Sequence, residues 1–199
     1  MRDDYTLAYM RDTHLYWTER QRTTVLDGKI FTIERVVHES ADGRTEPFTL
    51  VDSPDWANVI AVVKDEQLRD CFLMARQYRH GGACLSLEFP GGMVDKGETA
   101  QEAAARELRE EAGYGAKELR FLGATNPNPA FMTNTVSTFF AVEPHRLHAA
   151  ADRTLDENEI IDLELVPVDE ILNNPPQEFV GHGIMLVAMY WYHQAGRPR

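Results

Sequence analysis

The sequence has few cysteines and no long apolar run. Two of its 199 residues are cysteines, Cys71 and Cys84, and they form no CxxC pair. This usage is typical of thiols in a reducing compartment and makes a disulfide the less favoured interpretation. The longest apolar stretches, ANVIAVV and IMLVAMYWY, fall short of the roughly 18 to 20 residues that span a bilayer. We therefore expect no membrane partner.

Positive charge is also scarce. The chain has 20 Lys and Arg against 32 Asp and Glu, a net charge of −12. Excess negative charge repels phosphate backbones, so we expect no nucleic-acid partner. An acidic protein that handles phosphates would need a metal ion. The N-terminal MRDDYTLAYMRD has acids and no apolar core of the signal-peptide type, which predicts a cytoplasmic protein.

The residues that are abundant indicate a folded domain. With 43% hydrophobic and 10% aromatic residues, the chain can bury a real core. We predict two parts: residues 1–52, an N-terminal arm with a β hairpin, and residues 53–199, the main domain. The first thirty residues have no clean periodicity, and we predict no structure for them.

Alternating and apolar runs predict the strands. IFTIERVVH and PFTLVDS, joined by the Asp-Gly turn in ADGR, predict a hairpin. ANVIAVV and CFLMARQY are continuous apolar runs, which are typical of central strands buried on both faces. Further strands are expected at ELRFLGAT, TVSTFFAVE and EIIDLELVPV. The segment LEFPGGMVDKG, residues 87–97, is rich in Pro and Gly and predicts a loop.

Three helices are expected. In TAQEAAARELREEAG, Thr99 and Glu102 form a capping box, strong helix formers follow, and Gly113 supplies the C-terminal stop. VDEILNN predicts a short helix, and GIMLVAMYWYHQ predicts a terminal helix whose Met and aromatic side chains form a docking face. Strands and helices together indicate an α/β fold.

The helix that begins after Thr99 carries a cluster of acids. At 100° per residue, Glu107, Glu110 and Glu111 share roughly a 100° arc of its surface. Like charges at these spacings cost an exposed helix roughly 0.2–0.5 kcal/mol per pair, so helix stability does not favour the cluster. A solvated acidic face is the alternative interpretation. Clustered carboxylates beside a gap suit a hard divalent cation such as Mg²⁺.

Small residues around the acids suggest where that gap lies. Ala103 falls on the arc of the acids, so we expect no bulky side chain above them. The neighbouring side of the helix carries Ala105, Leu108 and Ala112, which we expect to dock the helix onto the core.

This segment resembles the signature of the Nudix family. Gly92, five residues, Glu98, seven residues and then REL-x-EE-x-G, residues 106–113, match every fixed position, and Tyr114 stands where an aliphatic residue is usual. The family hydrolyses nucleoside diphosphates linked to another group. The resemblance implies a Nudix-type α/β/α sandwich with a mixed central sheet, preceded by a small N-terminal β region.

The resemblance also implies a metal site. Glu107 and Glu111 would bind Mg²⁺ directly, Glu110 directly or through water, and the backbone carbonyl of Gly91 would add a ligand, with Mn²⁺ as the alternative metal. Such metals neutralise charge on a pyrophosphate and lower the pKa of an attacking water.

Arg106 and Glu98 belong to the same motif. Arg106 would hold and orient an acid, either Glu98 or Glu107; the alternative is a plain surface ion pair.

Outside the motif, the chain resembles the ADP-ribose and nucleotide-sugar pyrophosphatases from about Asp27 onward. In that branch a loop before the last strand carries a glutamate that acts as general base, which corresponds here to Glu157, with Glu159 as the fallback. Arg79, in RQYR, is the candidate for a phosphate contact, because a guanidinium pairs bidentately with phosphate oxygens. Arg76 is the alternative, and either arginine can instead pair with an acid.

The substrate stays open within this branch. Where ADP-ribose enzymes tend to have Ser-Pro-Gly followed by an acid, this chain has NPNPAFMTN, and Pro90-Gly91-Gly92 replaces their Pro-Ala-Gly. ADP-ribose leads, GDP-mannose and other nucleotide sugars stand nearly level, and the products would be a nucleoside monophosphate and a sugar phosphate. The sequence does not choose a base-stacking residue among Tyr16, Trp17, Phe31 and Trp56.

Two further inferences concern partners and competing classes. The relatives that the chain resembles are homodimers in which the N-terminal β region is exchanged or packed across the two-fold axis, which implies a homodimer here. A non-catalytic Nudix domain that senses a nucleotide is the competing class, and the intact acids at positions 107, 110 and 111 count against it. His145 and His148 are interpreted as solvated loop residues.

Overall fold

The computed structural model describes residues 12–147, 155 and 160–198. The chain divides into two compact units, Met1–Ser53 with Asn128–Thr133, and Pro54–Pro127 with Asn134–Arg199. The first unit thus includes a short segment, residues 128–133, that is distant from the rest of the unit in the sequence. Hydrogen bonds join this segment to the end of the hairpin, from Val51 N to Phe131 O at 2.8 Å and from Thr133 N to Val51 O at 3.1 Å.

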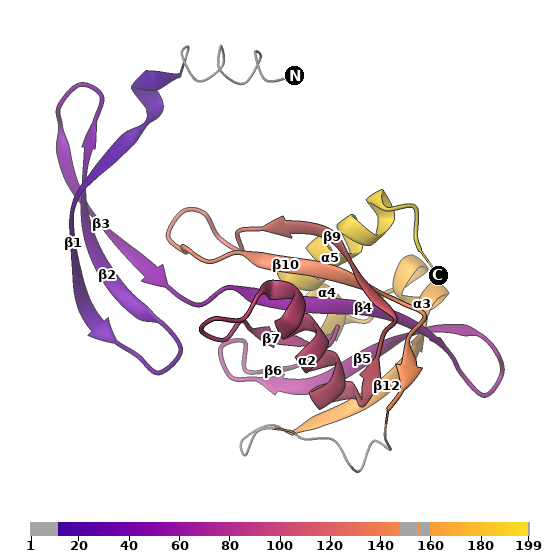
Figure 1. Ribbon diagram of the computed structural model, residues 1–199. Helices are drawn as coiled ribbons and strands as arrows, with labels where there is room; N and C mark the ends of the chain where they lie inside the picture. Colours follow the sequence, from indigo (N-terminus) through magenta and orange to yellow (C-terminus); the bar gives the residue numbers. More distant parts are fainter. Residues whose placement is uncertain (1–11, 148–154, 156–159, 199) are drawn as a thin grey trace. The chain divides into compact units, whose positions relative to one another are not determined.

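The first unit is a three-stranded antiparallel sheet in the order β1-β2-β3 (Figure 1). The 3-10 turn η1 (Thr13–Leu15) precedes β1 (Trp17–Asp27), β2 (Thr32–Ser40) and β3 (Thr45–Asp52). The expected hairpin is confirmed as β2 and β3. Strand β1 lies in the stretch for which no structure was predicted. All eleven of its residues are exposed, so its sequence has no alternation of buried and exposed residues to reveal it.

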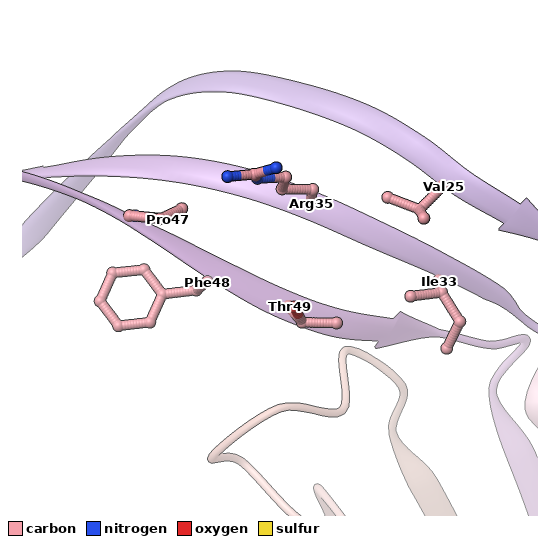
Figure 2. Close-up of a pocket in the computed structure, with 6 residues that line it drawn as sticks. All are labelled: Val25, Ile33, Arg35, Pro47, Phe48 and Thr49. Carbon is pink, nitrogen blue, oxygen red and sulfur yellow. The ribbon is translucent and has the colours of Figure 1, made fainter.

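One part of this sheet forms a shallow groove. Its volume is about 340 Å³, and Figure 2 shows the side chains that line it: Val25, Ile33, Arg35, Pro47, Phe48 and Thr49. Apolar side chains on β1 and β3 are solvent-exposed here, with Val25 at 63% and Phe48 at 41%.

The second unit is built on a seven-stranded mixed sheet. Its main path runs β12-β5-β4-β10-β9, with β6 added to β5 and β7 added to β4. The pairing of β4 with β10 is parallel, and the other pairings are antiparallel. The strands are β4 (Trp56–Lys64), β5 (Asp70–Arg79), β6 (Cys84–Glu88), β7 (Gly91–Met93), β9 (Glu118–Thr125), β10 (Val136–Val142) and β12 (Ile161–Pro167). A separate two-stranded pair consists of β8 (Tyr114–Gly115) and β11 (His145–Arg146).

The loop prediction for residues 87–97 was wrong in part. Strand β6 continues to Glu88, and β7 pairs with β4 through Gly91 opposite Asn58 and Met93 opposite Trp56. The pairing uses backbone groups, for which glycine is sufficient, so the Pro and Gly signal hid two short strands on either side of Pro90.

Helices cover both faces of the sheet, which confirms the α/β/α sandwich (Figure 1). Helix α2 (Ala100–Ala112) packs on one face, against residues such as Val59 and Leu73. Helices α3 (Val168–Asn173), α4 (Gln177–Val180) and α5 (Gly183–Gln194) pack on the other, around Ile60 and Phe72. The expected docking face of the terminal helix consists of Met185, Ala188 and Tyr192.

Alternation along β4 supplies both layers, because successive side chains of a strand point to opposite faces. None of the helices in the described part of the chain is long and apolar enough to cross a membrane.

Candidate active site

A capping box fixes where helix α2 begins. The Thr99 hydroxyl accepts a hydrogen bond from Glu102 N at 3.2 Å, and the Glu102 carboxylate accepts one from Thr99 N at 2.8 Å. The Thr99 backbone N–H lowers the pKa of Glu102 by hydrogen bonding to its charged form. Gly113 ends the helix with φ +71°. Both boundaries agree with the sequence prediction, so the angular positions of the acids on this helix are well defined.

The direction that the acids face differs from the prediction. Ala103, expected beneath an open gap, is fully buried in the core, whereas Ala105, expected to dock the helix, is exposed. The helix is therefore rotated so that the arc with Ala103, Glu107 and Glu111 points toward the sheet. Leu108 and Ala112 are buried as expected.

Two carboxylates are consequently buried. Glu107 is 9% exposed and Glu111 is 3% exposed, while Glu110 lies at the rim. Glu111 Oε2 accepts a hydrogen bond from Gly91 N at 2.8 Å, which joins the helix to β7. Burying ionised carboxylates is costly unless donors or cations compensate, so this placement requires partners.

The two glycines of β7, Gly91 and Gly92, lie too close to their neighbours to carry a side chain. A Cβ atom on Gly91 would lie 2.3 Å from the backbone oxygen of Ala57, and one on Gly92 would lie 2.3 Å from Glu107 Oε1. The glycines therefore allow the backbone to approach β4 and the Glu107 carboxylate directly.

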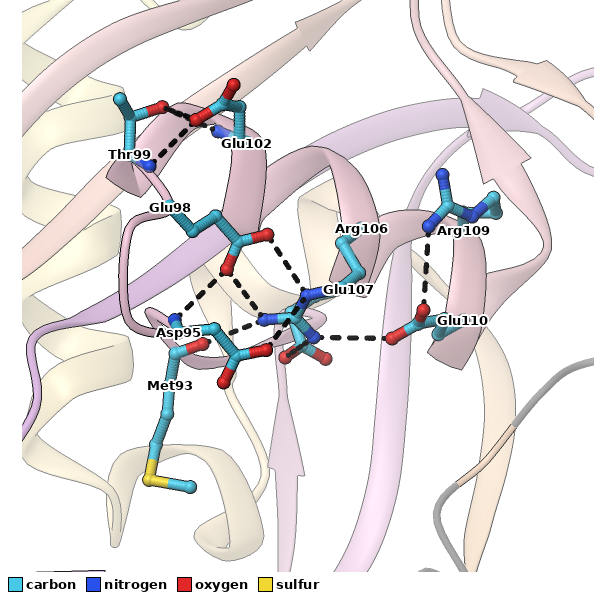
Figure 3. A network of polar contacts seen from close by, with 9 residues as sticks. All are labelled: Met93, Asp95, Glu98, Thr99, Glu102, Arg106, Glu107, Arg109 and Glu110. Carbon is cyan, nitrogen blue, oxygen red and sulfur yellow. Dashed lines mark hydrogen bonds and ion pairs between the residues drawn. The ribbon is translucent and has the colours of Figure 1, made fainter.

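Arg106 is the centre of a polar network (Figure 3). Its Nε and Nη2 donate to the two oxygens of Glu98 at 3.1 and 3.2 Å, and its Nη1 donates to Glu107 Oε1 at 2.7 Å and Glu110 Oε2 at 3.2 Å. Nη2 also donates to the backbone oxygen of Met93 at 2.9 Å. Arg106 thus contacts both acids that the sequence offered as its partners.

These contacts shift the ionisation of the network. Hydrogen bonding to Glu98, followed by the contacts with Glu107 and Glu110, raises the pKa of Arg106, and the guanidinium in turn lowers the pKa of Glu98. Both groups are therefore held in their charged forms at neutral pH.

The donor set fits a hard divalent cation. Glu107, Glu110 and Glu111 offer only oxygen ligands, and the absence of a Cβ atom at Gly92 lets the Glu107 carboxylate lie directly against the backbone of β7. Within the described residues, no group of three or more His, Cys, Asp or Glu side chains stands ready around a metal position. The Arg106 guanidinium instead occupies the space between Glu107 and Glu110.

The two candidate phosphate-binding arginines lie on opposite faces of the sheet. Arg76 pairs with Glu178 of α4 at 2.9 Å and with Glu164 of β12 at 3.5 Å. Successive side chains of a strand point to opposite faces, and Arg79 is an odd number of residues after Arg76 on β5. By this alternation Arg79 shares the face of Leu73, which packs against α2. Arg79 is therefore on the same side of the sheet as Glu107 and Glu111, and Arg76 is not.

The remaining candidates divide between described and undescribed residues. Glu157, Glu159 and His148 lie outside the described residues. His145 is exposed, as expected, but it lies in the short strand β11 and not in a loop. Of the aromatic candidates, Tyr16, Trp17 and Phe31 are exposed in the first unit and Trp56 is half-buried in β4.

Sequence reasoning missed one charged residue, Glu88. It is 3% exposed at the end of β6 and pairs with Arg79. A single acid within the apolar run LSLEF was the available signal, because an acid inside a buried strand needs a partner.

The fold and site together define an α/β/α protein with a buried acidic site suited to a divalent cation. Comparison with known families specifies this class further: residues 54–186 match the family described as NUDIX domain. The chain therefore belongs to the Nudix family of hydrolases, and the resemblance noted in the sequence is confirmed.

Individual relatives support this assignment. The chain is 30% identical over 148 residues to the ADP-ribose pyrophosphatase of Bacillus subtilis strain 168, covering 74% of this chain and 77% of the relative. It is 31% identical over 119 residues to the ADP compounds hydrolase NudE of Escherichia coli K12, covering 59% and 62%. A solved crystal structure of an ADP compounds hydrolase superposes with a TM-score of 0.72 at 25% identity, covering 92% of this chain and 97% of that one.

Proposed function

We propose that this protein hydrolyses the pyrophosphate bond of a nucleoside diphosphate sugar, with ADP-ribose as the leading substrate, to a nucleoside monophosphate and a sugar phosphate. The observation that carries the proposal is the burial of Glu107 and Glu111 beside Gly91 and Gly92 of β7. Relatives named for hydrolysis of ADP-ribose and ADP compounds support the substrate class. GDP-mannose and other nucleotide sugars are the alternative substrates.

Mg²⁺ is the proposed cofactor, with Mn²⁺ as the alternative. Glu107, Glu111 and Glu110 would hold it through carboxylate oxygens, together with the backbone carbonyl of Gly91. When bound, the metal would neutralise charge on the pyrophosphate and lower the pKa of a water molecule. Oxygen ligands of this kind are typical for Mg²⁺, which keeps several waters and bridges to phosphate.

Arg106 and Glu98 act on the acids. If a cation bound Glu107 and Glu110, Arg106 would retain two contacts to Glu98 and one to Met93 O and would so stay fixed. Before a cation binds, the contact of Arg106 Nη1 with Glu107 Oε1 would orient the Glu107 carboxylate and limit its rotation.

Arg79 is the proposed phosphate contact, supported by its position on the α2 face of the sheet. Both arginines pair with acids, but Arg76, the alternative, is less favoured because it lies on the opposite face of the sheet, beside Glu178 and Glu164. Glu157 is proposed as the general base, with Glu159 as the fallback. A carboxylate in that role would accept a proton from the attacking water.

A homodimer formed through the first unit is also proposed. The unit exposes several large apolar side chains that a partner could cover: Leu15, Tyr16, Trp17, Val25, Leu26, Ile30, Phe31 and Phe48. Exposed apolar side chains gathered in number are typical of interaction sites. The net charge of −12 supports the absence of a nucleic-acid partner.

Product analysis tests the proposed reaction. Incubation of the protein with ADP-ribose and Mg²⁺ should yield AMP and ribose 5-phosphate in equal amounts, separable by anion-exchange chromatography. In ¹⁸O-labelled water, one of the two products should acquire a single labelled oxygen. Formation of ADP and free ribose would place the cleavage at the phosphate ester of the terminal ribose and contradict the proposal.

A further inference from the structure

Glu88 is a buried carboxylate that belongs to neither the acid cluster of α2 nor the expected general base. It ends β6, where its backbone pairs with Ala75 of β5, and its side chain is only 5% exposed. An ionised group this deeply buried requires close counter-charges. The identity of these counter-charges indicates what Glu88 does.

Arg79 binds Glu88 at two points. Its Nε donates to Oε1 at 2.7 Å and its Nη2 donates to Oε2 at 2.6 Å, which is the parallel geometry of a bidentate pair. Burial, the largest single influence, would raise the pKa of Glu88, but the hydrogen bonds and charge of Arg79, with smaller contributions from His182 and Ser86, together lower that pKa. Glu88 is therefore anionic at neutral pH, and the pair is fully charged.

A third group near Glu88 comes from the helical layer that includes α5. His182, immediately before α5, places Nε2 at 3.8 Å from Glu88 Oε2. The carboxylate thus lies between a guanidinium from the sheet and an imidazole from the helical layer that includes α5. The bidentate contact with Arg79 restricts the rotation of this carboxylate and, reciprocally, of the guanidinium.

Part of the Arg79 side chain is exposed to solvent. Arg79 is the last residue of β5, and 45% of its side chain is exposed although its partner is buried. A bidentate contact through Nε and Nη2 fixes the plane of the group and directs the edge with Nη1 away from Glu88. Arg79 also lies on the face of the sheet that α2 covers, as described above.

We propose that Glu88 is a positioning residue that fixes the Arg79 guanidinium in the orientation that binds the substrate diphosphate. This inference rests on the proposed function, because it assigns Arg79 to substrate binding. A purely structural ion pair is the competing explanation. It predicts lower stability when Glu88 is changed, with no specific effect on substrate binding.

A double-mutant cycle in the full-length protein separates these explanations. For ADP-ribose hydrolysis, Glu88→Gln should raise KM about tenfold and change kcat by less than about threefold, because the lost interaction is with bound substrate. Arg79→Ala should raise KM at least as much. In the Arg79→Ala background, Glu88→Gln should add less than about a twofold effect, because the residue acts through Arg79.

The chain supplies a matched control. Glu178 pairs with Arg76 at 2.9 Å on the other face of the same strand. Glu178→Gln removes a comparable ion pair and should leave KM unchanged. Arg79→Lys covers the case in which Glu88→Gln fails to fold: lysine keeps the charge beside Glu88 but not the planar fork, and KM should rise about tenfold.

The outcomes are distinct. Folded Glu88→Gln protein with the wild-type KM, or effects that multiply in the double variant, would overturn the positioning role while leaving the proposed function intact. If the wild type cleaves no nucleotide sugar, the proposed function fails. Calorimetric titration with ADP, a diphosphate probe, then decides: non-additive losses of affinity in the cycle support the positioning role, and additive or absent losses overturn it.

Discussion

Arg106 and Glu107 are adjacent in the sequence, yet their side chains meet, with Nη1 of the arginine 2.7 Å from Oε1 of the glutamate. Neighbours on a helix point about 100° apart, so adjacent side chains do not ordinarily face each other. The contact arises because the guanidinium is anchored by Glu98 and by Met93 O. Arg106 thereby supplies positive charge to the acids.

Removing Arg106 should expose the repulsion among these acids. In EDTA, Arg106→Gln should lower the free energy of unfolding by about 1–3 kcal/mol, because partly buried carboxylates lose their charged donor. Mg²⁺ should then stabilise the variant more than it stabilises the wild type. Thermal unfolding with EDTA and with Mg²⁺ measures both effects.

Arg109→Gln is the control for this prediction. Arg109 is 53% exposed on the same helix and reaches Glu110 only at 3.5 Å, so its loss should change neither quantity. An Arg106→Gln protein as stable as the wild type in EDTA would show that the guanidinium does not compensate the buried acids.

Substitution of Gly91 and of Gly92 in β7 should have different effects on stability and activity. In Gly92→Ala, the new Cβ meets the carboxylate of Glu107, the movable end of a side chain. The fold should survive, but displacement of Glu107 should lower kcat about 100-fold, as expected for a catalytic group misplaced by about 1 Å.

In Gly91→Ala, the Cβ meets backbone atoms of Ala57 and Asn58. Backbone cannot move aside cheaply, so the free energy of unfolding should fall by about 1–3 kcal/mol. Chemical denaturation and steady-state kinetics distinguish the two variants, with Gly183→Ala, where a Cβ meets nothing within 4 Å, as the control. Equal stability losses in both glycine variants would refute the distinction.

The Arg79–Glu88 pair should make stability depend on pH. The pKa of Glu88 is depressed below its ordinary value of 4.5 by Arg79 against the effect of burial. A depressed carboxylate stabilises the fold fully above its unfolded pKa and loses that contribution as pH falls through its folded pKa. The stability difference between wild type and Glu88→Gln should therefore be constant near neutrality and shrink below about pH 4.5. Urea denaturation from pH 7 to 3.5 checks this, and a difference that widens toward acid would contradict it.

The proposed homodimer predicts a defined response to charge on the first unit. Val25 is 63% exposed, so Val25→Asp should leave the monomer fold intact while burying an unpaired charge in any interface across that sheet. Sedimentation velocity should show a dimer for the wild type and a monomer for the variant. Leu68→Asp, at a 76% exposed site in the second unit, should remain dimeric. A monomeric wild type would refute the proposal.

Local patterns predicted the elements whose signals are local. The Thr99–Glu102 box and Gly113 gave the boundaries of α2, and the apolar runs gave the central strands. Strand β1 was not predicted, because all its residues are exposed and its sequence therefore has no pattern of a buried face. Strand β7 was not predicted, because glycine pairs through its backbone alone and leaves no side-chain pattern in the sequence.

The parts of the site that depend on long-range packing were harder to predict. Spacing grouped Glu107 and Glu111, but the direction of the arc depended on which helix face meets the sheet, so the roles of Ala103 and Ala105 were reversed. Likewise, Arg76 and Arg79 differ only in the face of β5 that each occupies. The position of Glu88 depends on the pairing of β6 with β5 and on α5 packing from the other side.

The most direct test of the account is release of phosphate, in a phosphatase-coupled assay with Mg²⁺, from ADP-ribose, GDP-mannose, UDP-glucose, a nucleoside triphosphate and a dinucleoside polyphosphate. Glu111→Gln serves as the control. It keeps the shape of the buried side chain that accepts a hydrogen bond from Gly91 N and removes its charge. The account predicts cleavage of a nucleoside diphosphate sugar, foremost ADP-ribose, and its loss in Glu111→Gln. Silence on every compound together with metal-dependent binding of one of them would contradict it and indicate a nucleotide-sensing domain instead.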